Sequence, residues 1–327
     1  MNWAVTYDSA FGYVSAHGAP LVDLLDPQPG ERIIDLGCGT GAFSAEIAAR
    51  GAEVLGIDGN PDMVAQASAL NPGISFMLGD AHTFTITDAC DAVASNAALH
   101  WMTRDPDAVI AQVHAALRPG GRFVGELGGE GNCAELVAAM QTAWRVFGLG
   151  EPELPWYFPS PAEYATKLEE AGFTLRLLEH AERPSQMTEG PNGAADWVRA
   201  YAAGALADVP PELVEPLLSR VNDLAAPALR RESGWVADYV RLRFAAVRKP
   251  DAPPMPEPPP APPNPSAASA PEPAPPAPGP APGPVPGPVP APGPVPGSAA
   301  GPVPGSAPGP VPGAAPAPAG APDGSAR

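Results

Sequence analysis

Between residues 30 and 126, short apolar runs alternate with stretches whose apolar residues recur every three or four positions. The runs are rich in Val, Ile and Leu, which predicts buried strands, and the spacing within the longer stretches predicts helices. Alternating strands and helices are typical of a parallel sheet covered on both faces. We expect the strands at Arg32–Leu36, Glu53–Ile57, Ile74–Leu78, Ala92–Ser95 and Arg122–Glu126.

The same pattern predicts two more strands later in the chain, at Phe173–Glu179 and Tyr239–Arg248. The intervening region is largely helical and carries several of the few aromatic residues, so we expect a helical cap within about residues 150–235. The predicted fold is α/β: a Rossmann-like, doubly wound, mostly parallel seven-stranded sheet with a helical cap insertion. Ligands of such sheets lie beyond the carboxyl ends of the strands, so the loops there are the first candidates for chemistry.

The composition changes sharply at residue 250. Of the 49 Pro residues, 32 lie in residues 250–327, where Gly and Ala make up most of the rest. Such a segment buries too little apolar surface to offset the entropy of ordering, so we expect a disordered Pro/Gly/Ala-rich tail. Residues 1–249 are long enough to form one domain, of which residues 30–126 would be the cofactor-binding core.

Charge and composition exclude several classes of function. Residues 1–249 carry 17 basic and 32 acidic side chains, and so acidic a body would repel a phosphate backbone, which disfavours nucleic acid. Neither a membrane span nor a signal peptide is visible, so we expect a cytoplasmic protein. The three widely spaced cysteines indicate neither a disulfide framework nor a thiolate metal site, and we expect no metal.

The first loop carries glycines at Gly37, Gly39 and Gly41, where the backbone can turn tightly against a flat ligand. Asp58 ends the second predicted strand, and a carboxylate there can accept hydrogen bonds from both hydroxyls of a ribose. The glycine spacing differs from the dinucleotide fingerprint. Asp35, just before the loop, would repel a pyrophosphate but attract an ammonium. S-adenosylmethionine has an ammonium and a sulfonium but no phosphate.

Five segments resemble, in order, the motifs of the class I S-adenosylmethionine-dependent methyltransferases: Ile33–Gly41, Gly56–Asp58, Leu78–Ala81, Asp91–Asn96 and Leu117–Gly121. Three more are similar to the trans-aconitate methyltransferase-like group: Ser95–Trp101, Tyr157–Pro161 and Asp238–Arg241. The resemblance implies S-adenosyl-L-methionine as cofactor. It also implies cofactor-binding roles for Asp35, Gly37, Gly39, Gly41, Asp58, Met63, Asp80, Ala81 and Asn96.

The sequence indicates the site of the methyl acceptor less clearly than that of the cofactor. His100 could orient an acceptor or take its proton, and Trp101, Trp156 and Tyr157 are candidates for the pocket wall. Arg199, Arg241 and Arg243 could bind an anion, although the alternation of Arg241 and Arg243 with apolar residues favours an exposed strand face. The expected reaction is methyl transfer to a small molecule, with O-methylation of a carboxylate first among the candidates. C- or O-methylation of a quinone, phenol or other secondary metabolite, or a cofactor-binding scaffold without turnover, remain alternatives.

Overall fold

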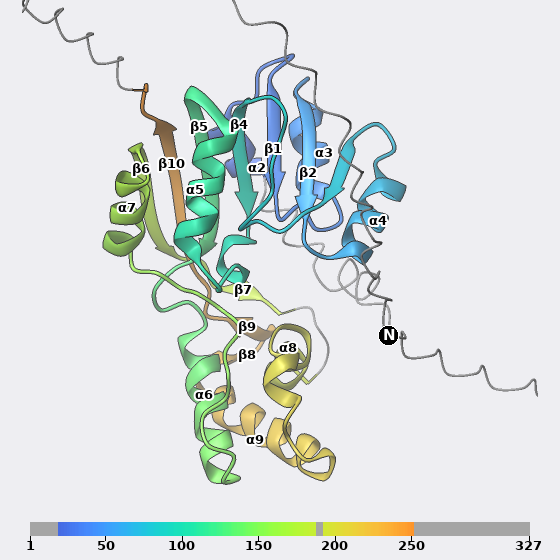
Figure 1. Cartoon of the computed structure of the whole chain (residues 1–327). Helices are drawn as coiled ribbons and strands as arrows, with labels where there is room; N and C mark the ends of the chain where they lie inside the picture. Colours follow the sequence, from blue (N-terminus) through green and yellow to red (C-terminus); the bar gives the residue numbers. More distant parts are fainter. Residues whose placement is uncertain (1–18, 188–191, 252–327) are drawn as a thin grey trace, which may run out of the picture. The chain divides into compact units, whose positions relative to one another are not determined.

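The strands predicted from the sequence form a seven-stranded sheet in the computed structural model, which describes residues 19–187 and 192–251 (Figure 1). The strands are β1 (Arg32–Leu36), β2 (Glu53–Asp58), β3 (Ser75–Leu78), β4 (Cys90–Asn96), β5 (Leu117–Gly128), β6 (Phe173–Glu182) and β10 (Val240–Arg248). Their order is β3-β2-β1-β4-β5-β10-β6. The first five are parallel, and β10 runs antiparallel to β5 and β6. The predicted fold class is confirmed.

Helices cover both faces of this sheet. They are α2 (Ala19–Leu25), α3 (Ala42–Ala48), α4 (Pro61–Leu70), α5 (Pro106–Ala116) and α7 (Pro161–Glu170), with the short 3₁₀ helix η1 at Leu99–Trp101. Ile33 belongs to a buried cluster that includes residues of α2 and α3, whereas Ile34 belongs to the cluster on the opposite face that includes residues of α5 and α7. Successive strand residues point to opposite faces, so both must be apolar when both faces are covered.

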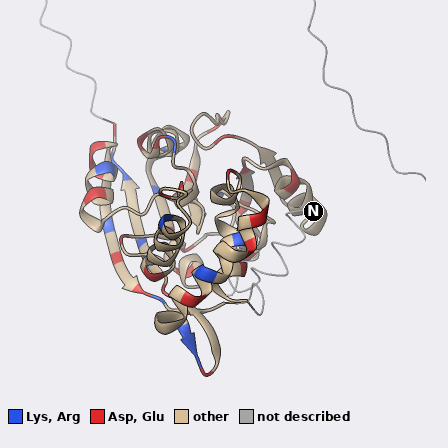
Figure 2. Cartoon of the chain, turned by 90° about the horizontal axis from the view of Figure 1, so that it is seen from below, with Lys and Arg blue, Asp and Glu red and all other residues tan. Residues whose placement is uncertain are grey.

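The cap has a core of its own. It contains α6 (Ala134–Val146), α8 (Ala194–Tyr201), the 3₁₀ helix η2 (Ala203–Leu206), α9 (Pro211–Leu229) and the short strands β7 (Ser185–Gln186), β8 (Arg230–Arg231) and β9 (Gly234–Ala237). Figure 1 shows α6, α8 and α9 beyond the carboxyl ends of the parallel strands. Acidic and basic positions are interspersed along these helices (Figure 2).

The cap is assembled from two separate stretches of the chain. Helix α6 precedes residue 150 yet packs with α9, whereas α7 and β6, which follow residue 150, belong to the sheet layers. The cap therefore differs in extent from the expected 150–235 region, because the chain returns to the sheet edge before it enters the longer insertion between β6 and β10. Most of the predicted tail, residues 252–327, lies outside the described residues.

The two central strands set the position of a crevice. From β1 the chain continues to β2 on one side, whereas β4 lies on the other side of β1. The loops that follow β1 and β4 therefore diverge, which is the arrangement that opens a ligand crevice in doubly wound sheets. Gly37 directly follows β1, and Asn96 ends β4.

Candidate functional site

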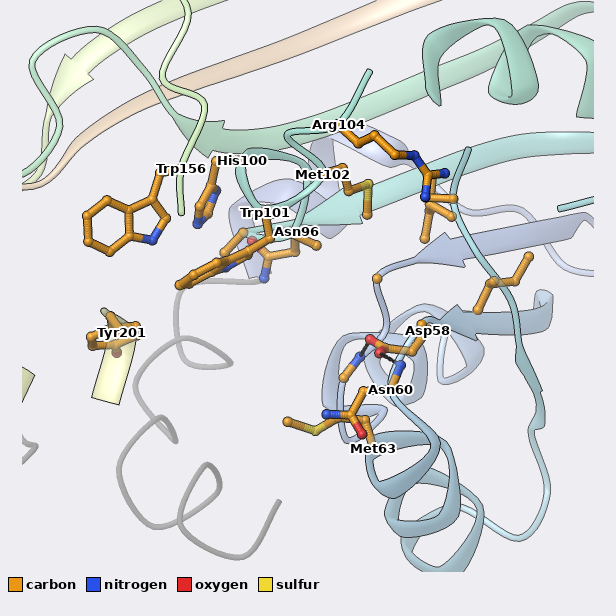
Figure 3. A pocket seen from close by; sticks show the side chains of 18 of the residues that line it. Asp58, Asn60, Met63, Asn96, His100, Trp101, Met102, Arg104, Trp156 and Tyr201 are labelled. Atoms are coloured by element: carbon orange, nitrogen blue, oxygen red, sulfur yellow. Dashed lines mark hydrogen bonds between the residues drawn. The ribbon is translucent and has the colours of Figure 1, made fainter. Parts of the chain in front are cut away.

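A cavity of about 880 Å³ opens at this crevice, between the strand ends and the cap. Figure 3 shows Asp58, Asn60 and Met63 on one side of the cavity and His100, Trp156 and Tyr201 on the other. The predicted site residues that line it are Gly37, Gly39, Asp58, Met63, Asp80, Ala81, Asn96, His100, Trp101 and Trp156. Residues far apart in the sequence thus line one cavity.

Two glycines of the first loop form part of the cavity wall. Gly37 has a φ of +76°, and a Cβ there would lie 2.3 Å from the Cβ of Ala98. Gly39 has a φ of +53°, but the space above its Cα is open. The loop therefore needs glycine at Gly37 for close packing, whereas Gly39 presents bare backbone to a ligand.

Asp58 holds this loop in place. One carboxylate oxygen accepts a hydrogen bond from the N–H of Gly39 at 2.9 Å, and the other accepts from the N–H of Asn60 at 2.8 Å. Each oxygen has a second lone pair, and the residue lines the cavity. Asp58 can therefore accept further hydrogen bonds from a diol while it braces the loop.

A second acidic group lies beyond β3. Asp80 accepts from the backbone N–H and the Nδ1 of His82 at 2.9 and 2.7 Å, and from Arg104 at 2.7 Å. These hydrogen bonds hold the pKa of Asp80 well below its usual range, so the group is ionised. Met63 and Ala81 are buried beside it and make this part of the wall apolar.

Asp35 and Gly41 are not among the residues that line the cavity. Asp35 is 1% exposed and accepts a hydrogen bond from Ser44 Oγ at 2.5 Å. Burial, and to a smaller extent the negative charge of Asp58, raise the pKa of this carboxyl to about 7, although the hydrogen bond from Ser44 acts in the opposite direction. Gly41 caps α3 with a φ of +84°, and a Cβ there would lie 2.8 Å from Asn71 and Phe76. Asp35 and Gly41 therefore shape the glycine loop without facing the cavity.

His100 lies in η1, directly after β4, and is 7% exposed. Its Nδ1 accepts a hydrogen bond from the N–H of Gly128 at 3.3 Å, which leaves the proton of a neutral ring on Nε2. Burial, together with the positive charge of Arg241, lowers the pKa of His100 to about 3. The imidazole is therefore neutral at pH 7 and suited to donating a hydrogen bond from Nε2.

Aromatic side chains form the cap side of the cavity. Trp101 is 40% exposed, stacks on Tyr201 with ring centroids 6.5 Å apart, and meets Trp156 edge-on at 5.9 Å. Tyr157 does not line the cavity, because its ring packs against the sheet core and its hydroxyl donates to Glu163 at 2.6 Å. Neighbouring residues of an extended segment point in opposite directions, so Trp156 and Tyr157 could not both face the cavity.

Several lining residues were not predicted from the sequence. Asn132 follows β5, Phe158 precedes α7, and Tyr239 precedes β10. Arg241 also lines the cavity rather than an exposed strand face, because β10 lies between β5 and β6 and its end reaches the cap. Phe158, Tyr239 and Arg241 fall within segments that resemble the methyltransferase motifs, but only the tertiary fold shows that they face the cavity.

The loop side of the cavity fits an adenosine-bearing cation. Its acidic groups are Asp58 and Asp80, and Arg104 is already paired with Asp80. Among the described residues, a pyrophosphate would face these carboxylates with no unpaired cation on this side of the cavity, whereas an ammonium or sulfonium is favoured there. Apolar contacts for a planar base come from Ile57, Met63 and Leu78.

Within residues 19–187 and 192–251, no cluster of His, Cys, Asp and Glu has the arrangement of a metal site. In the same part of the chain, no helix has the length and apolar character needed to cross a membrane.

Known proteins resemble this chain in sequence. A family model described as a methyltransferase domain matches residues 33–121. The chain is 30% identical over 258 residues to "Uncharacterized methyltransferase C70.08c" of Schizosaccharomyces pombe, which covers 74% of this chain and 96% of that protein. It is 30% identical over 201 residues to trans-aconitate 2-methyltransferase of Methylobacterium radiotolerans, with 55% of this chain and 73% of that protein covered.

The fold is also similar to that of a solved structure. The YcgJ protein of Bacillus subtilis matches with a TM-score of 0.51 and 15% identity, over 71% of this chain and 97% of that one. At this identity, the similarity concerns the fold alone.

Proposed function

Because the chain belongs to the class I S-adenosylmethionine-dependent methyltransferases, and so takes S-adenosylmethionine as its cofactor, we propose that it methylates a small-molecule carboxylate. The observation that carries this proposal is that the glycine loop and the aromatic cap wall face the same cavity. The same cavity can therefore bind the cofactor and, next to it, an acceptor with planar or apolar parts.

In the proposed complex, Gly37 and Gly39 lie against the amino-acid end of the cofactor and Asp58 binds the ribose. Asp35 attracts the ammonium through its charge from beneath the loop. Met63, Asp80 and Ala81 contact the adenine, and Asn96 lies beside the methionine portion. The open space above Gly39 and the spare lone pairs of Asp58 support this assignment.

The chain's own contribution to catalysis is alignment. When bound, S-adenosylmethionine supplies an activated methyl group with a good leaving group. Trp101, Trp156 and Tyr201 would then hold the acceptor and exclude water from the reacting atoms. Asn96 and His100, at the end of β4 and just after it, would orient the two reactants.

The properties of His100 favour a carboxylate over a phenol. A base is needed only when the acceptor carries its proton at the working pH, and a ring with a pKa of about 3 is a weak base. A carboxylate arrives ionised and needs only a hydrogen-bond donor. The relative that is named trans-aconitate 2-methyltransferase supports the same class of acceptor.

Release of S-adenosylhomocysteine tests the proposal. The protein is incubated with S-adenosylmethionine and either matched carboxylic acids and phenols or a metabolite extract. With S-adenosylmethionine saturating at every pH, we expect release with carboxylic acids at a rate that stays flat above pH ~5, because carboxyl groups are ionised there. A rate that rises towards pH ~10 would indicate a phenol instead. No release with any addition would indicate a binding module without turnover.

A further inference from the structure

Arg241 reaches the cavity from β10 without an acidic partner among the described residues. Its Nη1 donates to Asn132 Oδ1 at 3.1 Å, and the guanidinium carbon lies 4.4 Å from the ring centroid of Tyr239. Its Nε is buried and has no hydrogen-bond partner within residues 19–187 and 192–251. The side chain is thus held in place by neutral groups, and no carboxylate of the described residues pairs with its charge.

Glu126 on β5 and Asp238, just before β10, each bind a group other than Arg241. Glu126 pairs with Arg183 and with Arg243, whose Nη2 lies 2.7 Å from its Oε2. Asp238 accepts from the backbone N–H of Glu135 at 2.8 Å through Oδ2, whereas its Oδ1 is buried and has no hydrogen-bond partner among the described residues. A partly buried cation without a counter-ion is costly, so its presence in a cavity wall indicates that a ligand supplies the negative charge.

We propose that Arg241 recognises a carboxylate of the methyl acceptor and thereby restricts this enzyme to negatively charged acceptors. The inference rests on the proposed function and names a specificity-determining residue for it. The planar guanidinium matches the two oxygens of a carboxylate, and Asn132 fixes its orientation.

His100 adds a second donor to the same subsite. Both residues are tied to Gly128: His100 Nδ1 accepts from its N–H, and Arg241 is its partner across the β5–β10 ladder. A Cβ at Gly128 would lie 2.5 Å from the ring of Phe158, so the backbone here is closely covered. The aromatic rings around the subsite exclude water and strengthen an ion pair formed in it.

Binding of model anions tests the inference without knowledge of the natural acceptor. The full chain is saturated with S-adenosylhomocysteine, and the affinities of benzoate, trans-cinnamate and citrate are measured by calorimetry and by quenching of tryptophan fluorescence. The neutral cinnamamide is measured beside cinnamate. The variants are Arg241→Gln, which removes the charge, and Arg241→Lys, which keeps it. Arg145→Gln on α6 removes the same charge from an exposed cap position.

We expect at least one carboxylate to bind, and cinnamamide to bind at least tenfold more weakly than cinnamate. Arg241→Gln should weaken carboxylate binding at least tenfold, Arg241→Lys less, and Arg145→Gln not at all. Equal binding of cinnamate and cinnamamide, or no carboxylate binding by the unaltered protein, would overturn the inference even if a variant failed to fold. If the unaltered protein does not bind S-adenosylhomocysteine at all, that result would instead count against the proposed function.

Discussion

Asp58 accepts a hydrogen bond from the N–H of Gly39, so the carboxylate at the end of β2 braces the loop that follows β1. This contact joins the ends of two neighbouring strands where the cofactor is proposed to lie. The loop conformation and the proposed ribose contact therefore depend on one side chain.

Asp58→Ala should weaken S-adenosylmethionine binding tenfold or more. The loss of hydrogen bonds to a charged group corresponds to about 1.5–3 kcal/mol. Calorimetry on the purified variant measures it, with Asp62→Ala as the control because Asp62 is an exposed acidic residue of the adjacent helix α4. Equal affinities in Asp58→Ala and the unaltered protein would argue against the assigned pocket.

Cofactor affinity should rise with pH up to about 7 and then level off, because burial raises the pKa of Asp35 to about 7. A cationic ligand favours the ionised carboxylate, so binding below this pH releases a proton and weakens as the pH falls. Asp35→Asn should bind more weakly at pH 8 and lose this pH dependence. Calorimetry between pH 6 and 8 measures this pH dependence of cofactor affinity. If the affinity of Asp35→Asn changes with pH as strongly as that of the unaltered protein, Asp35 is not the source of the dependence.

His100→Ala should lower the free energy of unfolding by about 1–3 kcal/mol, because the buried N–H of Gly128 loses its acceptor. His100→Asn keeps a nearby acceptor and should cost less. Urea denaturation measures both. Equal stability of the alanine variant and the unaltered protein would show that this N–H finds another partner.

We also expect His100 to make the stability of the protein depend on pH. Its pKa is lowered to about 3 in the folded protein, so only the unfolded chain binds its proton between the ordinary histidine pKa near 6.5 and about 3. Stability should therefore fall as the pH falls through this window, and His100→Asn should remove that part of the slope. Denaturation series at pH 7 and 5 on both proteins give the comparison.

Glu126→Ala should destabilise the protein by about 3 kcal/mol, at the lower end of the range for breaking a buried ion pair. Glu126 is 2% exposed, whereas Arg183 and Arg243 retain some solvent contact that limits the cost. Glu179→Ala is the matched control, because this exposed residue lies 3.9 Å from Arg243 and should cost less than 1 kcal/mol. Similar losses in the two variants would contradict the central role of Glu126.

Local patterns predict the sheet and the loop side of the site because each depends on nearby residues. Asn60 and Pro61 mark the start of α4. The side chain of Asn60 is the N-cap of this helix and accepts a hydrogen bond from the backbone N–H of Asp62. The acceptor side depends on contacts between distant segments instead. The alternation around Arg241 is typical of a half-exposed strand, and only the position of β10 between β5 and β6 brings that arginine to the cavity.

The insertion between β6 and β10 leaves and re-enters the sheet at two adjacent, hydrogen-bonded strands. This attachment allows the part of the cap from β7 to β9 to diverge in sequence while the glycine loop and the β1–β4 crevice stay intact, provided that α9 keeps its contacts with α6. Evolution can thereby alter the Tyr201 side of the cavity without rebuilding how the methyl donor is held.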